Sequence, residues 1–124
     1  MITSPPRVCA IATLGFLLGC ASPHTLTQRT PVLEFTTPLS PREVASRISR
    51  EWSKELANIS TLLDGDGYLI SYMHPFAGAD ATVSIQPSGS GSKVRYFERM
   101  PSLTPAWMSA PVKGCNIQAA EKAS

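Results

Sequence analysis

The segment that begins at Ser40 constrains the fold of this chain more than any other. Ser40 is a favourable N-cap residue, Pro41 stands at the first helical position, and Glu43 follows the cap by three residues, as in a capping box. The pattern predicts a helix. Its apolar residues recur at helical spacing and form one stripe: Val44, Ala45, Ile48, Trp52 and Leu56. Because such a stripe has to be buried, we expect the helix to lie on a sheet.

The opposite side of this helix is rich in Arg and Lys, which is also typical of helices that lie on a membrane surface. However, Glu43, Glu51 and Glu55 dilute the positive charge, and Glu43 stands four residues before Arg47, a spacing that allows an ion pair. These acidic residues favour an ordinary solvated face and a helix packed on the protein core.

Several segments are rich in strand-forming residues or alternate between apolar and polar side chains: 32–36, 59–63, 68–73, 81–86, 93–98 and, more weakly, 112–117. A short helical piece is expected from Thr104-Pro105 to Ala110, ended by Pro111. This order predicts an α+β fold of the form β-α-β-β-β(-β). We expect one long amphipathic helix packed on an antiparallel sheet of about four to five strands.

An apolar run from Val8 to Leu18 follows the single charge of Arg7. The run is too short for a membrane span, which needs about 20 residues. A Pro/Thr-rich stretch follows it at once, so neither a core helix nor a membrane anchor fits as well as a secretory signal.

The run ends in Leu17-Leu18-Gly19-Cys20. This motif resembles the lipobox of bacterial lipoproteins. The resemblance implies cleavage between Gly19 and Cys20, lipidation of Cys20 and attachment to a membrane through that lipid. Cys20 is not followed by Asp, and the resemblance therefore implies the periplasmic face of the cell outer membrane.

These features divide the chain into four parts: a lipoprotein signal peptide at 1–19, a lipidated tether at 20–31, a small α+β domain at 32–118 and a disordered tail at 119–124. Loss of residues 1–19 would leave ten Lys and Arg against nine Asp and Glu. Such a balanced charge argues against a nucleic-acid partner. Cys115 would be the remaining free thiol, either a buried small hydrophobe or an intermolecular thiol.

The sequence carries no recognisable set of catalytic residues, and we expect neither enzyme activity, nor a cofactor, nor a metal site. The Ser/Gly-rich stretch between two expected strands is a candidate binding loop, because loops on a rigid hairpin often carry binding: Ser88, Gly89, Ser90, Gly91 and Ser92. We therefore expect a non-catalytic binding or structural module with an unknown envelope protein as its partner.

An alternative is an inhibitor of a cell-wall hydrolase. Small lipoproteins of the lysozyme-inhibitor type carry a Ser-Gly motif closely followed by Tyr, and Ser88 to Gly91 before Tyr96 is distantly similar. The wider Tyr spacing and the expected helix both depart from that pattern. A third hypothesis, which the sequence supports less, is that the chain is a minor enzyme.

The lipobox interpretation predicts that cells expressing this chain incorporate labelled palmitate into it, and that Cys20→Ser abolishes the incorporation. The measurement is radiolabel or click-label on the immunoprecipitated protein. Label that survives in the Cys20→Ser variant would contradict the assignment of the lipid to this residue.

Overall fold

The computed structural model describes residues 22–55 and 58–117. Its elements are α2 (Pro23–Leu26), β1 (Leu33–Thr37), α3 (Pro41–Ser53), β2 (Ile59–Asp64), β3 (Gly67–His74), β4 (Gly78–Ser88), β5 (Gly91–Glu98) and α4 (Ala106–Lys113). The expected α+β class and the antiparallel sheet are both present, and the sheet is the larger part of the structure.

The five strands form one antiparallel sheet in the order β1-β5-β4-β3-β2. Strands β2 to β5 are joined in sequence as hairpins, and β1 pairs with β5 at the far side. Two of the hairpins have two-residue turns in which the first turn residue is a glycine with positive φ, Gly65 at 61° and Gly89 at 59°. A residue with a side chain rarely adopts this backbone conformation, which explains glycine at both positions.

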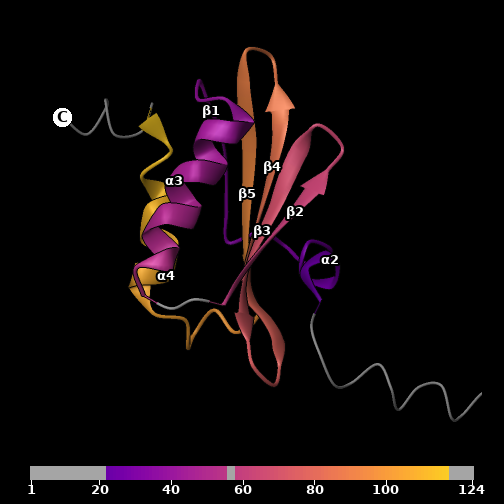
Figure 1. Ribbon diagram of the computed structural model, residues 1–124, viewed down its shortest axis with the longest axis vertical. Coiled ribbons are helices and arrows are strands. Elements are labelled where there is room, and N and C mark those ends of the chain that lie inside the picture. Colours follow the sequence, from indigo (N-terminus) through magenta and orange to yellow (C-terminus); the bar gives the residue numbers. More distant parts are fainter. Residues whose placement is uncertain (1–21, 56–57, 118–124) are drawn as a thin grey trace, which may run out of the picture.

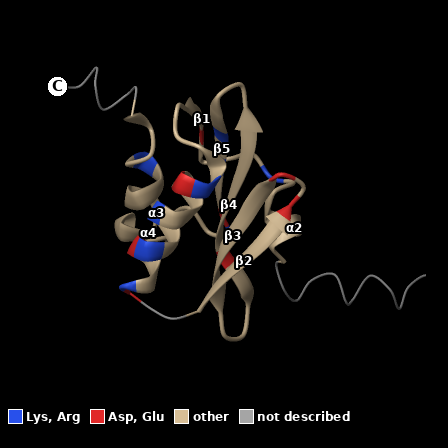
Figure 2. Ribbon diagram, turned by 45° about the horizontal axis from the view of Figure 1, so that its top comes forward, with Lys and Arg blue, Asp and Glu red and all other residues tan. Residues whose placement is uncertain are grey.

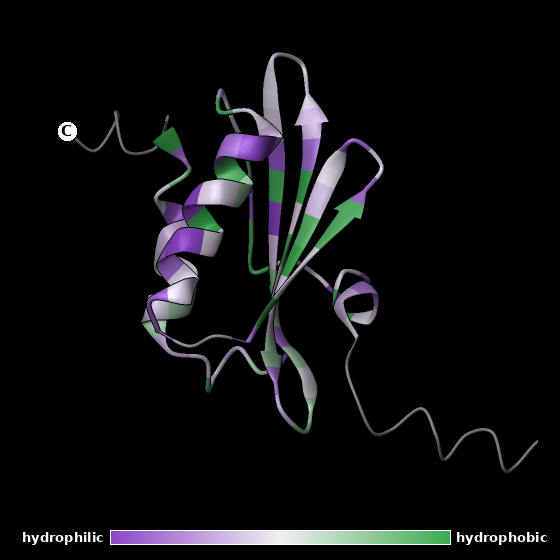
Figure 3. Ribbon diagram, in the orientation of Figure 1, coloured by the Kyte–Doolittle hydropathy of each residue, from purple (hydrophilic) through white to green (hydrophobic). Residues whose placement is uncertain are grey.

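Helices α3 and α4 lie side by side on one face of the sheet, called here the helix face, and α2 lies on the opposite face (Figure 1). Apolar and polar residues alternate along the strands (Figure 3). The main core lies between the helices and the sheet. Its strand residues come from β3, β4 and β5: Ile70, Tyr72, Ala81, Val83, Ile85, Val94 and Tyr96.

Helix α3 begins as its sequence predicts, because the Ser40 hydroxyl accepts a hydrogen bond from the Glu43 amide at 3.2 Å. The stripe residues Val44, Ala45, Ile48 and Trp52 are buried, while Leu56 lies outside the described residues. Glu43 and Arg47 form the expected ion pair at 3.1 Å on the exposed side. Figure 2 shows both signs of charge along this helix.

The C-terminal part of the domain differs from the expectation. Residues expected to form a final strand at 112–117 instead include the end of α4, and Pro111 lies inside that helix. Two helices therefore cover the helix face, with Met108 and Val112 of α4 in the core. Pro111 is tolerated because Val112 remains buried against the core, and the Gly114 amide still donates to the Ala110 carbonyl at 3.0 Å.

The expected tether also contacts the domain from Ser22 onward. Ser22 caps α2, and Leu26 is fully buried on the opposite face with Ala79 and Phe97. The short run of sequence around Leu26 has no apolar period that would reveal this contact. Gly19, Cys20 and the tail at 119–124 lie outside the described residues. Within the described parts, no helix is long and apolar enough to cross a membrane.

The tight start of β5 predicts a strong effect of Gly91→Ala. A Cβ atom there would lie 2.0 Å from the Thr37 carbonyl oxygen, so the backbone would have to shift. We expect a loss of about 2–3 kcal/mol in the free energy of unfolding, measured by denaturant titration.

Gly114→Ala is the matched control, because its Cβ would have 3.5 Å to the nearest atoms and its φ is −65°. We expect that variant to change the unfolding free energy by less than about 0.5 kcal/mol. Equal unfolding midpoints for the two variants would show that the close approach at Gly91 is not maintained.

Candidate binding site

The candidate site begins with an irregularity in the sheet between β3 and β4. Tyr72 pairs with Ala81, but the next β3 residue, Met73, pairs with Ala79. Asp80 is therefore an extra residue in β4, as in a β-bulge. The bulge changes which way the neighbouring side chains face: Ala79 packs on the opposite face and Ala81 in the main core. In a regular strand these two residues would share one face.

Asp80 forms an ion pair with Arg99, which follows the end of β5. Its Oδ1 accepts hydrogen bonds from Arg99 Nε at 3.1 Å and Nη2 at 2.5 Å. The backbone joins the same residues, because the Arg99 amide donates to the Asp80 carbonyl at 2.8 Å. Both side chains are largely covered, with 27% of Arg99 and 23% of Asp80 exposed. The pair fixes the chain where it leaves the sheet.

The loop after Arg99 is held by its own hydrogen bonds. The Met100 carbonyl accepts from the Leu103 amide at 2.9 Å and from the Thr104 hydroxyl at 2.8 Å. Arg29, which follows α2, donates from Nη1 to the Arg99 carbonyl at 2.8 Å. Thr104 therefore closes the loop, and Pro105 occupies the N-cap position of α4 without a side-chain cap.

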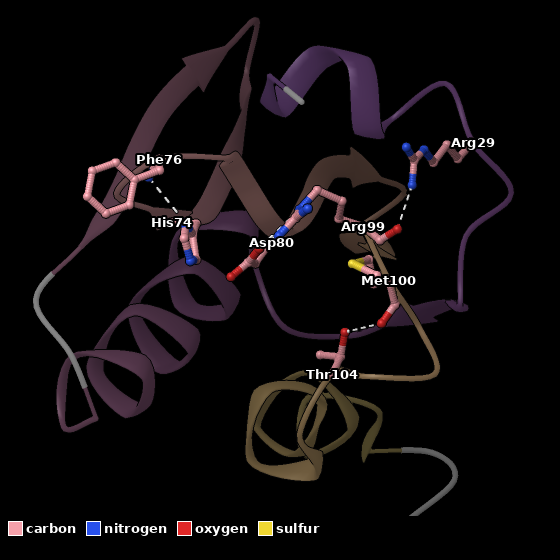
Figure 4. Close-up of polar contacts among 7 residues, drawn as sticks. All are labelled: Arg29, His74, Phe76, Asp80, Arg99, Met100 and Thr104. Atoms are coloured by element: carbon pink, nitrogen blue, oxygen red, sulfur yellow. Dashed lines mark hydrogen bonds and ion pairs between the residues drawn. The ribbon is translucent and has the colours of Figure 1, made fainter. Parts of the chain in front are cut away.

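The hairpin between β3 and β4 forms the other side of this end of the molecule. His74 is the last residue of β3, and its Nδ1 accepts a hydrogen bond from the Phe76 amide at 3.1 Å. Gly78 returns the chain into β4 with a φ of 85°. Figure 4 shows the Asp80–Arg99 pair between the hairpin residues His74 and Phe76 and the loop residues Met100 and Thr104.

A hollow of about 240 Å³ lies on the loop side of this pair. Asp80 and Arg99 supply its polar wall, and loop and α4 residues supply the remainder: Met100, Leu103, Thr104, Pro105 and Met108. It is smaller than the roughly 300–1,000 Å³ of typical small-molecule sites. Its size and its mixed walls suit a single inserted side chain.

Three large apolar side chains are exposed at this end of the domain. Phe76 is 89% exposed, Leu103 70% and Met100 45%. Isolated exposed apolar residues are ordinary, but Met100 and Leu103 line the hollow, and exposed apolar residues at a hollow are typical of surfaces that bind other proteins. We call Phe76, Met100 and Leu103, with the hollow and the Asp80–Arg99 pair, the bulge-end surface.

The core beneath this surface is aromatic. The ring of Tyr72 meets Trp52 and Trp107 edge to face, at centroid distances of 6.3 and 5.5 Å. Burial raises the pKa of the Tyr72 hydroxyl, and the negative charges of Asp80 and Glu55 raise it further. Tyr72 is therefore a neutral phenol at physiological pH, and it adds no charge to the site.

The binding loop expected from the sequence lies in another hairpin, between β4 and β5. It is a short turn of two residues, because Ser88 ends β4 and Gly91 begins β5. Gly89 and Ser90 are exposed, but Gly91 and Ser92 are buried, and the Ser92 hydroxyl donates to the Leu39 carbonyl at 2.7 Å. Much of this stretch therefore has a structural role in joining β5 to the start of α3.

Two further residues singled out in the sequence are buried. Tyr96 is fully buried, and its hydroxyl donates a hydrogen bond to Glu98 Oε2 at 2.7 Å. Burial is the main cause of the strongly raised pKa of this hydroxyl, with Glu98 adding to it. Cys115 is 1% exposed, and burial raises the pKa of its thiol, which disfavours the reactive thiolate.

Sequence reasoning missed the bulge-end surface because nothing local marks a bulge in Gly78 to Ala81. The one available signal was Asp80, a charged residue among small apolar neighbours. Its partner Arg99 lies 19 positions away and becomes a neighbour only through β-pairing. Among the described residues, no group of three or more His, Cys, Asp and Glu side chains is placed to hold a metal ion.

Comparison with known proteins returned no relative. The chain matched no protein-family model, and no curated protein or solved structure matched it significantly.

The geometry predicts measurable coupling between Asp80 and Arg99. In a double-mutant cycle with Asp80→Ala and Arg99→Ala, we expect a coupling energy of about 1 kcal/mol, the upper end for partly exposed pairs. The measurement is denaturant unfolding of the four proteins. A matched cycle on the exposed pair of Glu43 and Arg47 should give about 0.3–0.5 kcal/mol. Additive effects at Asp80 and Arg99 would show that the pair does not stabilise this end.

Proposed function

We propose that this chain is a lipid-anchored lipoprotein of the bacterial envelope, and that its domain is a non-catalytic module that binds an envelope protein. In this proposal Cys20 carries the lipid, and the domain faces the periplasm from the outer membrane. The lipobox residues Leu17 to Cys20 support the anchor. Several acyl chains on one residue would make release from a membrane negligible, since a single chain binds only marginally.

The bulge-end surface supports the binding role. Its apolar side chains are exposed, but the backbone beneath them is held by the Asp80–Arg99 pair and by the two hydrogen bonds to the Met100 carbonyl. A surface that is already ordered loses little conformational entropy on binding. In this proposal α3 is the amphipathic helix that packs on the sheet and stabilises it. The β3–β4 hairpin and the loop after Arg99 therefore keep their relative positions.

The chemistry of the same surface suits binding better than catalysis. Asp80 is engaged by a guanidinium, and His74 Nδ1 already accepts a backbone hydrogen bond. Neither is poised as a general base toward a nucleophile. The mixed walls of the hollow fit an apolar side chain of a partner with a polar group at its rim.

The inhibitor alternative receives no support from the geometry. It depended on Tyr96 standing near the Ser/Gly turn as a contact residue, and Tyr96 is buried in the core.

Photo-crosslinking in intact cells tests the binding surface. A photoreactive amino acid in place of Phe76 or Leu103 should capture one specific envelope protein, identified by mass spectrometry after purification of this chain. Ser90 is the matched control, because it is exposed in another hairpin turn, away from the bulge-end surface.

We expect little or no specific capture from position 90. Two outcomes would contradict the assignment of the binding role to the bulge-end surface. One is capture of the same protein from position 90 as from positions 76 and 103. The other is that neither position 76 nor position 103 captures a protein.

A further inference from the structure

The two edges of the sheet are protected unequally. At one edge, β1 lies between Pro31 and Pro38 and carries Glu34, which pairs with Lys93 at 3.4 Å. At the other edge, β2 has no Pro, Lys or Arg within the strand or in the two residues on either side of it. Natural proteins commonly block strand edges with such residues, because an unblocked edge pairs with other strands. The β2 edge is open in this sense.

The open edge also exposes apolar side chains. Leu62 is 42% exposed and Leu63 80% exposed, and they project to opposite faces of the sheet. The other large apolar side chains exposed in the described part of the chain are Val32 and the three apolar residues of the bulge-end surface. Exposed apolar side chains on both faces of an unblocked edge strand are typical of a strand that acquires a neighbour.

The backbone of β2 is available for pairing at alternate residues. The Asn58 carbonyl accepts from the Met73 amide at 2.8 Å and so points toward β3. In an antiparallel pair this direction alternates along the strand. Ile59, Thr61 and Leu63 therefore direct their N–H and C=O groups away from β3, to the side where no described strand lies.

We propose that this edge pairs with β2 of a second copy of the chain, antiparallel, about a two-fold axis at Thr61. This register uses the full length of the strand. It places each residue opposite a suitable neighbour in the other copy: Thr61 with Thr61, Ile59 with Leu63, Ser60 with Leu62, and Asn58 with Asp64. The two sheets become continuous, with the α3–α4 layers on the same side.

The side chains favour a second copy as the occupant. Leu63 meets Ile59, which already packs against the core, so the most exposed residue of the strand becomes covered. Asp64 is the only charged residue of β2, and its carboxylate already accepts a hydrogen bond from Gln86 Nε2 at 3.1 Å. In the proposed register it stands opposite Asn58, so no charge faces it. The two Asp64 carboxylates lie at opposite ends of the paired strands, which are about 20 Å long. The edge is therefore complementary to itself.

Pairing along one short strand gives a small interface, at the low end of specific interfaces, below about 1,200 Å². We therefore expect a reversible dimer that forms best at high local concentration. The inference concerns an edge that the proposed function does not use, and it does not depend on that function.

Cysteine crosslinking of the full chain in cells tests the register. In the hydrogen-bonded pair at the axis, the two Thr61 Cα atoms would lie about 5.5 Å apart, within the range of a disulfide. Thr61→Cys should therefore give a disulfide-linked homodimer on a non-reducing gel after mild oxidation. Thr36→Cys on β1 is the matched control, and the parent chain gives the background; its Cys115 is buried.

A second substitution distinguishes loss of the dimer interface from loss of folding. Adding Leu63→Lys to Thr61→Cys should cause loss of the dimer band, because it places a charge opposite Ile59. Adding Leu103→Lys, at a similarly exposed leucine outside the edge, should not. Thermal unfolding of each variant verifies that the domain is folded.

The proposal is overturned if folded Thr61→Cys yields no more dimer than Thr36→Cys. It is also overturned if Leu62→Cys crosslinks better than Thr61→Cys, because the axis would then lie elsewhere, or if Thr61→Cys becomes linked to a different protein instead of to a second copy.

Discussion

The packing of Trp52 holds the two helices and the sheet in one arrangement. Its indole Nε1 donates to the Met108 carbonyl of α4 at 2.9 Å, and its ring packs edge to face on Tyr72 of β3. Tyr72 in turn contacts Trp107 of α4. The hydrogen bond contributes about 1 kcal/mol and each aromatic pair about 0.5–1.5 kcal/mol. This group therefore joins α3, α4 and β3 at one place in the core.

The bulge-end surface depends on this aromatic group. α4 supplies one wall of the hollow through Met108. Tyr72 pairs with Ala81, which directly follows the extra bulge residue Asp80. The position of the surface thus follows from core packing. The open β2 edge has a different origin, because it depends on what β2 lacks: proline, lysine and arginine. We therefore propose contacts at two separate surfaces, one at an end of the sheet and one along its side.

Much of the fold was predictable because its signals are local. The cap at Ser40, the stripe of α3 and the alternation in β4 each depend on residues a few positions apart, and each appears in the structure. The differences from the sequence expectation concern contacts between distant segments. Pro111 lies within a helix because Val112 packs against the core, and Leu26 is buried because Phe97 lies beneath it. The Ser/Gly stretch became a tight turn because β4 and β5 pair to their ends.

The sequence alone determined α3, the five strands and the order in which they occur, since capping, periodicity and turn chemistry act within a few residues. It also carries the lipobox resemblance at Cys20, which is read from adjacent residues. Only the tertiary structure decided where β1 pairs, which residue of β4 becomes the bulge, and which apolar side chains remain exposed. These outcomes depend on strand register between segments far apart in the chain, and the energies that set register appear only when those segments meet.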